Sequence, residues 1–171
     1  MIIIVTGLPS SGKSYFASHL SALINAVYIN SDQVRKRLFI RRTYSEAEKL
    51  SVYAHMLREM KDAVRQHKDV VMDATFYKKS IRENFLRQAG GTETVAFIEI
   101  KADEALIKDR LKQARTDSEA DFEVYQKIKE QWEPLEEPHL TLQSTNKNID
   151  SMLAQAGDYL NITINDQGTD R

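Results

Sequence analysis

The sequence contains no cysteine and has few of the residues that interrupt regular structure. Among its 171 residues there are three prolines, six glycines and one tryptophan. The lack of cysteine excludes disulfide bonds and thiolate metal sites within the chain, and it favours an intracellular protein.

Long apolar runs are also missing. No stretch approaches the roughly 18 apolar residues of a membrane span, and Met1 leads into an apolar strand without the features of a signal peptide. We therefore expect a cytoplasmic protein with no membrane partner. With 42% apolar and 29% charged residues, the composition is that of a folded domain. We expect one domain over residues 1–164, followed by a frayed tail at 165–171.

Charge is unevenly distributed although the net charge is only −1. Residues 1–100 carry a net charge of +5 and residues 101–171 one of −6. The most basic stretch contains Arg35, Lys36, Arg37, Arg41 and Arg42. Such a stretch is either a solvated helix face with its loop or an attractive surface for an anionic ligand.

Hydrophobic periodicity alternates between the strand and the helix pattern. Strands are expected at 2–6, 26–30, 69–73, 94–100 and 139–143, and helices at 13–24, 32–39, 45–67, 78–89, 103–114, 118–132 and 148–160. Within the longest helix, the expected apolar stripe is Leu50, Tyr53, Leu57, Met60 and Val64. The alternation predicts an α/β fold, a parallel sheet with helices on both faces.

The clearest motif is the phosphate-binding loop G-x-x-x-x-G-K-[ST], here Gly7-Leu8-Pro9-Ser10-Ser11-Gly12-Lys13-Ser14. Its glycines let the backbone wrap a phosphate, and the N–H groups of the following helix point at the anion. Lys13 is expected to contact the β- and γ-phosphates, and Ser14 to offer its hydroxyl to Mg²⁺. We include Tyr15, the next residue, in the nucleotide-binding segment.

Motifs of other P-loop classes are absent. A GTPase needs D-x-x-G and N-K-x-D; no Asp lies three before a Gly, and in Asn146-Lys147-Asn148-Ile149-Asp150 the Asp comes one residue too late. The few glycines and the lack of an LSGGQ-like element exclude an ABC cassette. The size fits a small kinase, in which Mg²⁺·ATP meets a second substrate.

Two carboxylates follow the second and third expected strands. Asp32 stands in Ser31-Asp32-Gln33-Val34-Arg35, and Asp73 in Asp73-Ala74-Thr75. Because ligands bind outside the carboxyl ends of parallel strands, Lys13, Asp32 and Asp73 are expected at one edge, as phosphoryl transfer requires. Taken singly, Ser31 or Asp32 could merely cap a helix, and Asp73 could be a turn residue.

Two arginines, Arg110 and Arg115, stand in DRLKQAR. In a kinase, arginines on a lid close over the nucleotide and offset charge on the transferred phosphate. Alternatively, they form ordinary i,i+4 pairs on a solvated helix.

Together, GLPSSGKS, SDQVRKRLF, DVVMDATFYKKSIRENF and RLKQAR with SEADFEVYQKIKEQWEP resemble the predicted-kinase family of small P-loop ATPases. That family is related to polynucleotide 5′-kinases, zeta toxins and gluconate-type kinases, and the likeness covers about residues 1–145. It implies a nucleoside-kinase-like P-loop fold, with a five-stranded sheet of order 2-3-1-4-5 and a helical lid at about 103–120.

The resemblance also implies roles for individual residues. Lys13 and Ser14 match the P-loop pair, Asp32 the general base, and Arg35 an arginine that binds an acceptor phosphate. Asp73 and Thr75 resemble the segment near the acceptor and the metal, so that Ser14 and Asp73 would hold Mg²⁺. Arg82 matches a basic acceptor-side position, and Arg110 and Arg115 resemble lid arginines.

The sequence thus predicts an ATP-dependent kinase that transfers the γ-phosphate to a hydroxyl acceptor. The acceptor is either a small molecule or a nucleic-acid 5′ end, which would make the protein a polynucleotide 5′-hydroxyl kinase. The alternative from another class is a nucleotide-dependent binding module without phosphotransfer.

Overall fold

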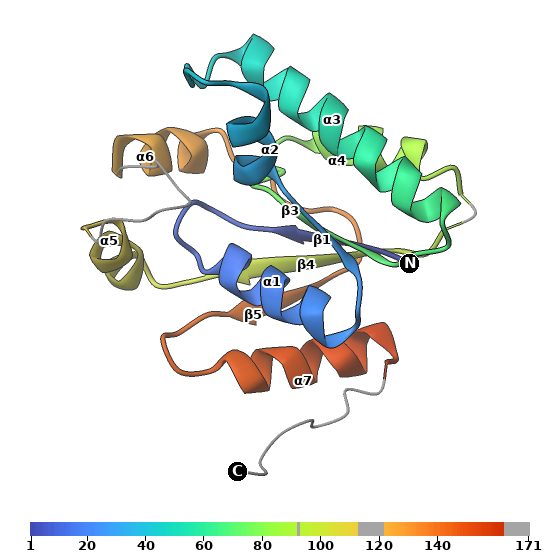
Figure 1. The fold of residues 1–171 in the computed structure, drawn as a ribbon. Helices are drawn as coiled ribbons and strands as arrows, with labels where there is room; N and C mark the ends of the chain where they lie inside the picture. Colours follow the sequence, from blue (N-terminus) through green and yellow to red (C-terminus); the bar gives the residue numbers. More distant parts are fainter. Residues whose placement is uncertain (92, 113–121, 163–171) are drawn as a thin grey trace.

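A parallel sheet forms the centre of the fold (Figure 1). The computed structural model describes residues 1–91, 93–112 and 122–162. The strands are β1 (Ile2–Thr6), β2 (Val27–Asn30), β3 (Val70–Asp73), β4 (Val95–Lys101) and β5 (His139–Gln143). They pair in the order β2-β3-β1-β4-β5, all in parallel, which confirms the predicted 2-3-1-4-5 sheet.

Helices alternate with the strands along the chain. Their bounds are α1 (Lys13–Leu23), α2 (Ser31–Leu38), α3 (Glu46–Arg65), α4 (Lys79–Gln88), α5 (Glu104–Lys112), α6 (Phe122–Glu130) and α7 (Ile149–Leu160). Residues 113–120 of the expected lid and the expected tail at 165–171 lie outside the described residues.

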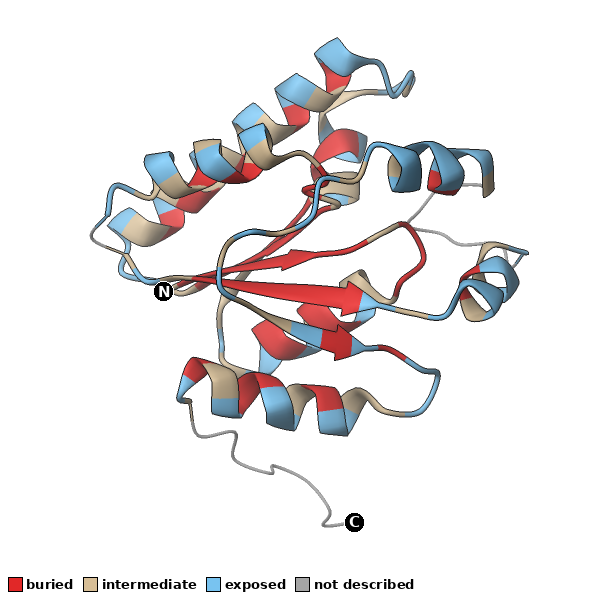
Figure 2. Cartoon of the chain, turned by 180° about the vertical axis from the view of Figure 1, so that it is seen from behind, coloured by how far each residue is buried: buried red, intermediate tan, exposed pale blue. Residues whose placement is uncertain are grey.

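The sheet is buried between helices on both faces (Figures 1 and 2). One core cluster packs α2, α3 and α4 against Ile2, Ile4 and Met72, and the other packs α1 and α7 against Ile3 and Val5. Because β1 lies in the middle of the sheet, alternate side chains of this strand enter opposite cores.

The stripe predicted for α3 is wrong at its first position. Leu50 is 67% exposed, and the fully buried apolar side chains of α3 are Val52, Met56, Met60 and Ala63. Leu50 lies about 120° around the helix from Met56 at 100° per residue, so one rotation of α3 cannot bury both.

No helix within the described ranges 1–91, 93–112 and 122–162 is long and apolar enough to cross a membrane.

Candidate active site

The P-loop connects β1 to α1 and packs against the end of β4. A Cβ at Gly7 would lie 2.5 Å from the carbonyl oxygen of Ile100, so a side chain does not fit there. Gly12 has φ 96°, and a Cβ there would lie 2.5 Å from Ser144 Oγ. Both glycines are therefore required by close approach as well as by backbone conformation.

The loop presents the groups expected of a phosphate cradle. Gly12 is the N-cap of α1, and no side chain caps that helix end. Lys13 and Ser14, in its first turn, are partly exposed, and Tyr15 is 60% exposed with its ring 4.2 Å from that of His19. The free N–H groups at this helix end favour an anion.

Asp73 ends β3 level with Asn30 of β2 and Val5 of β1. Its Oδ2 accepts hydrogen bonds from the Tyr28 hydroxyl, at 2.7 Å, and from Asn30 Nδ2. Burial, together with the charge of Asp73, raises the pKa of Tyr28 well above its usual value, so the phenol stays a donor. Two neutral donors thus fix one oxygen of this buried carboxylate.

The other oxygen of Asp73 suits a metal ion. Oδ1 is buried and has no hydrogen-bond partner among the described residues, and the Tyr28 hydroxyl that holds Oδ2 also lies 3.5 Å from the Ser14 carbonyl oxygen. Within the described chain, no group of three or more His, Cys, Asp or Glu could hold a metal. One carboxylate and one hydroxyl fit Mg²⁺, which keeps waters and phosphate oxygens as its remaining ligands.

Asp32 does not cap α2. The N-cap is Asn30, whose Oδ1 accepts from Gln33 N at 2.9 Å. Asp32 Oδ1 instead accepts from Arg35 NH1 at 3.1 Å, and its side chain remains 33% exposed. Burial raises the pKa of Asp32; Lys13 and Arg35 oppose the shift, and Asp73 adds to it. Lys13 and Asp73 therefore both lie near enough to Asp32 to act on its charge.

Arg35 is committed to protein partners. Its Nε lies 2.9 Å from Glu48 Oε1, and its guanidinium lies 4.6 Å from the centre of the Tyr44 ring. Burial pushes the pKa of Glu48 upward, but hydrogen bonds from Thr43 and Tyr44 and the charge of Arg35 outweigh it, so the pKa is lowered. In this geometry Arg35 holds Asp32 through NH1 and faces Glu48 through Nε.

Thr75 and Arg82 both belong to the region that follows β3. The Thr75 carbonyl accepts from Thr6 Oγ1 at 2.6 Å, and its side chain lies near Tyr53 of α3. Arg82 is fully buried and donates to the carbonyls of Phe76, at 2.9 Å, and Pro134, at 2.8 Å. Arg82 thus joins the segment after β3 to the segment before β5.

Arg110 contacts the nucleotide loop from the side of β5. Its guanidinium donates to the Ser10 carbonyl at 3.2 Å, to the Thr145 carbonyl at 3.1 Å and to Asn146 Oδ1 at 3.1 Å. Arg110 therefore joins α5 to the P-loop and to the β5–α7 loop. Arg115 lies outside the described residues.

The sequence did not reveal a cavity of about 720 Å³ beneath α5 and α6. It touches the P-loop at Leu8 and Ser11 and is walled by Tyr125 and Trp132. Its floor includes Glu99, a buried carboxylate whose Oε2 lies 3.1 Å from Lys101 Nζ and 3.7 Å from His139 Nε2. No sequence motif marks these residues, because they meet only when β4 and β5 pair.

Comparison with known proteins identifies the family and the fold of the chain. A family model described as an AAA domain matches residues 2–135. The chain belongs to this AAA domain family. Over 95% of both chains, the fold of this family member superposes on a sugar kinase from Janibacter sp. HTCC2649 with a TM-score of 0.73 and 14% identity.

Two further solved structures share the fold of this AAA domain protein. A gluconokinase from Sinorhizobium meliloti 1021 matches with a TM-score of 0.68 and 17% identity, covering 93% of this chain and 94% of that one. The APS kinase CysC from Mycobacterium tuberculosis, in complex with AMPPNP and APS, matches with a TM-score of 0.68 and 15% identity, covering 94% and 96%. The fold is therefore that of the P-loop kinases, as predicted.

Proposed function

We propose that this protein is an ATP-dependent phosphotransferase that moves the γ-phosphate of ATP to the hydroxyl of a small acceptor. The observation that carries the proposal is Asp32. This carboxylate has a raised pKa, is held by Arg35, and lies within electrostatic reach of Lys13 of the P-loop. A carboxylate so placed suits a general base, whose pKa should approach the working pH.

Each group has a distinct part in the transfer. The P-loop N–H groups and Lys13 bind the β- and γ-phosphates and offset the charge that develops during transfer. Asp32 accepts the proton of the acceptor hydroxyl as its oxygen bonds to the γ-phosphorus and the bond to the β–γ bridging oxygen breaks. Ser14 Oγ and Asp73 Oδ1 would hold Mg²⁺, which when bound neutralises phosphate charge. Tyr28 and Asn30 keep Asp73 in place.

The structural neighbours support the chemical class of the reaction. They include a sugar kinase, a gluconokinase and an APS kinase in complex with AMPPNP and APS. We extend to this chain a nucleotide donor and a small hydroxyl acceptor between α2, α3 and the end of β3. ATP as the donor, Mg²⁺ as the metal and a cytoplasmic location are part of the same proposal.

A polynucleotide 5′-hydroxyl acceptor is the second candidate, and the basic stretch at 35–42 favours it. Two of its arginines are occupied, however: Arg35 by Asp32 and Glu48, and Arg37 by Glu59 at 2.9 Å. A nucleic-acid backbone would have to compete with these carboxylates, so the small acceptor is preferred.

The test compares the two carboxylates. We expect Asp32→Asn to lower kcat by about 10²–10⁴-fold with little change in the KM for ATP, because the base acts on the acceptor. Asp73→Asn should instead raise the Mg²⁺ concentration needed for half-maximal rate. The measurement is transfer from γ-labelled ATP to a panel of polyols, sugar acids and a 5′-hydroxyl oligonucleotide.

The panel also separates the alternatives. Label on the oligonucleotide alone would replace the small acceptor with the polynucleotide one. ATP binding without label on any acceptor would favour the binding module. If Asp32→Asn keeps the wild-type kcat while Asp73→Asn is inactive, Asp32 is not the base.

A further inference from the structure

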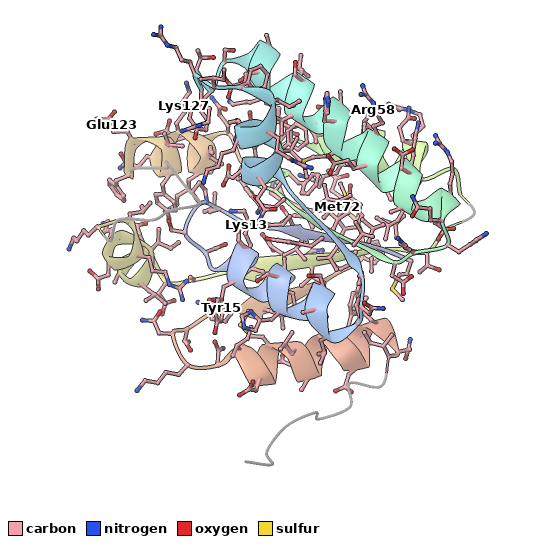
Figure 3. All side chains as sticks on the ribbon, in the orientation of Figure 1. Lys13, Tyr15, Arg58, Met72, Glu123 and Lys127 are labelled. Carbon is pink, nitrogen blue, oxygen red and sulfur yellow. The ribbon has the colours of Figure 1, made fainter. Side chains whose placement is uncertain are left out.

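Two lysines contact one exposed carboxylate, Glu46, at the N-terminal end of α3, and a third adds to the positive charge around it. Lys49 Nζ of α3 lies 2.9 Å from Glu46 Oε1, and Lys78 Nζ, just before α4, lies 3.8 Å from Glu46 Oε2. Lys127 of α6 also acts on the charge of Glu46, and Figure 3 labels it on the side of α6 near α2. We call Lys49, Lys78 and Lys127 the lysine cluster.

Two lysines of the lysine cluster lie against a buried aromatic ring. The ring of Tyr77 is buried, and its centre lies 5.7 Å from Lys49 Nζ and 5.4 Å from Lys78 Nζ. The Tyr77 carbonyl accepts from Glu133 N at 2.9 Å, which ties this segment to the chain before β5. The two ammonium groups therefore share one aromatic ring as a contact.

The charges at this place do not balance. Among the described residues, Lys49 Nζ and Lys78 Nζ lie 2.9 Å and 3.8 Å from Glu46, and Lys127 adds to the positive charge around it, so the positive charge exceeds that of the one carboxylate they share. The Glu46 side chain is 67% exposed, and an ion pair so open to water is weak. An incoming anion could therefore take the place of Glu46 at small cost.

Along α3, the lysine cluster adjoins the residues that hold the proposed general base, Asp32. Glu48, which holds Arg35 and through it Asp32, immediately precedes Lys49 on α3. Tyr53, one turn beyond Lys49, contacts Thr75, which follows Asp73 by two residues. The cluster and the base thus lie along one wall, formed by α3 and the segment after β3.

We propose that the lysine cluster is an anion subsite for the acceptor, where an oxyanion of the acceptor displaces Glu46. This inference rests on the proposed function, since it places the acceptor hydroxyl at Asp32 and its carboxylate, sulfate or phosphate group at the cluster. The substrate class is then an anionic hydroxy compound. The Glu46 carboxylate fills the subsite when no acceptor is bound, and a neutral polyol would not displace it.

The test measures binding and needs no phosphotransfer. Inorganic phosphate is titrated into the ADP-saturated protein at constant ionic strength and followed by calorimetry. Glu46→Gln is expected to tighten phosphate binding roughly 3- to 10-fold, and Lys49→Met or Lys78→Met to weaken it to a similar extent. Repeating the series in Lys13→Ala separates this site from the P-loop.

Glu59→Gln is the matched control, because it removes the same charge from the same helix, beside Arg37. Unchanged phosphate affinity in Glu46→Gln, or equal tightening in Glu59→Gln, would overturn the subsite. Sodium gluconate and neutral D-glucitol then separate acceptor classes: gluconate binding should respond to Glu46→Gln and glucitol binding should not, and an equal response of both would also overturn it. Absence of kinase activity would leave this binding result intact, so the two proposals fail separately.

Discussion

At the scale of single residues, the groups around Asp32 have opposite effects on its pKa. Burial and the neighbouring Asp73 raise its pKa, and Lys13, Arg35 and Lys36 lower it. Among these cations, Arg35 contacts Asp32 directly, with NH1 3.1 Å from Asp32 Oδ1. Arg35 therefore positions the carboxylate and also keeps more of it in the basic form.

We predict that Arg35→Met moves the acid limb of the kcat–pH profile to higher pH. Loss of the cation raises the pKa of Asp32 further, so the base is deprotonated only at higher pH; the expected shift is about one unit. The measurement is kcat against pH with saturating substrates. Arg35→Lys, which keeps the charge, should restore most of the profile.

The control for Arg35→Met is Arg37→Met, which changes an exposed arginine of the same helix. Its profile should match the wild type. An Arg35→Met limb that does not move, in a protein whose folding is shown by circular dichroism, contradicts this role of Arg35.

At the scale of elements, two segments far apart in the chain are joined beside the active site. Arg82 donates to the carbonyls of Phe76 and Pro134, and its Nε lies 3.5 Å from Glu137 Oε2. Glu133 accepts from Lys79 N at the start of α4. The segment before β5 is thereby fixed against the segment after β3, which carries Tyr77 and Thr75.

We predict that Arg82→Met lowers the free energy of unfolding by about 3 kcal/mol. The change leaves two carbonyl oxygens and a largely buried carboxylate without their donor, and such losses are costly in the interior. Urea unfolding measures the effect. Arg87→Met, on the same helix but exposed, should change stability by less than about 0.5 kcal/mol. Equal losses of stability in the two variants would show that the buried contacts of Arg82 do not stabilise the fold.

The sequence predicted the elements more fully than their contacts. Strand and helix bounds follow from local periodicity, and the P-loop and the carboxyl ends of three strands brought Lys13, Asp32 and Asp73 together. The partner of Arg35 is Glu48, on the next helix, and the partners of Arg82 include Pro134, 52 residues away. Such pairs depend on how helices pack on the sheet, which no local pattern specifies.

At the scale of the whole molecule, ion pairs link the basic part of the chain to the acidic part. Lys79 of the basic part pairs with Glu136 of the acidic part at 2.6 Å, and Arg82 meets Glu137. Arg35 and Arg37 instead pair with Glu48 and Glu59 within the basic part, which leaves the net charge of that part unchanged. The uneven distribution of charge along the sequence therefore contributes to contacts between distant segments at Lys79 and Arg82.

The central place of the P-loop gives a test on the whole molecule. The loop follows β1, the middle strand, and packs against β4, so nucleotide binding should stabilise the entire fold. At a concentration 100 times the Kd, Mg²⁺·ADP should add about 2.7 kcal/mol to the free energy of unfolding, which for a chain of this size corresponds to a rise in Tm of about 5–10 °C.

Lys13 is partly exposed, so Lys13→Ala should keep the Tm of the free protein and lose most of the rise. Lys68→Ala, an exposed lysine outside the loop, should keep both. Scanning fluorimetry across a nucleotide series measures these values, and a full rise in Lys13→Ala would show that this lysine does not bind the phosphates.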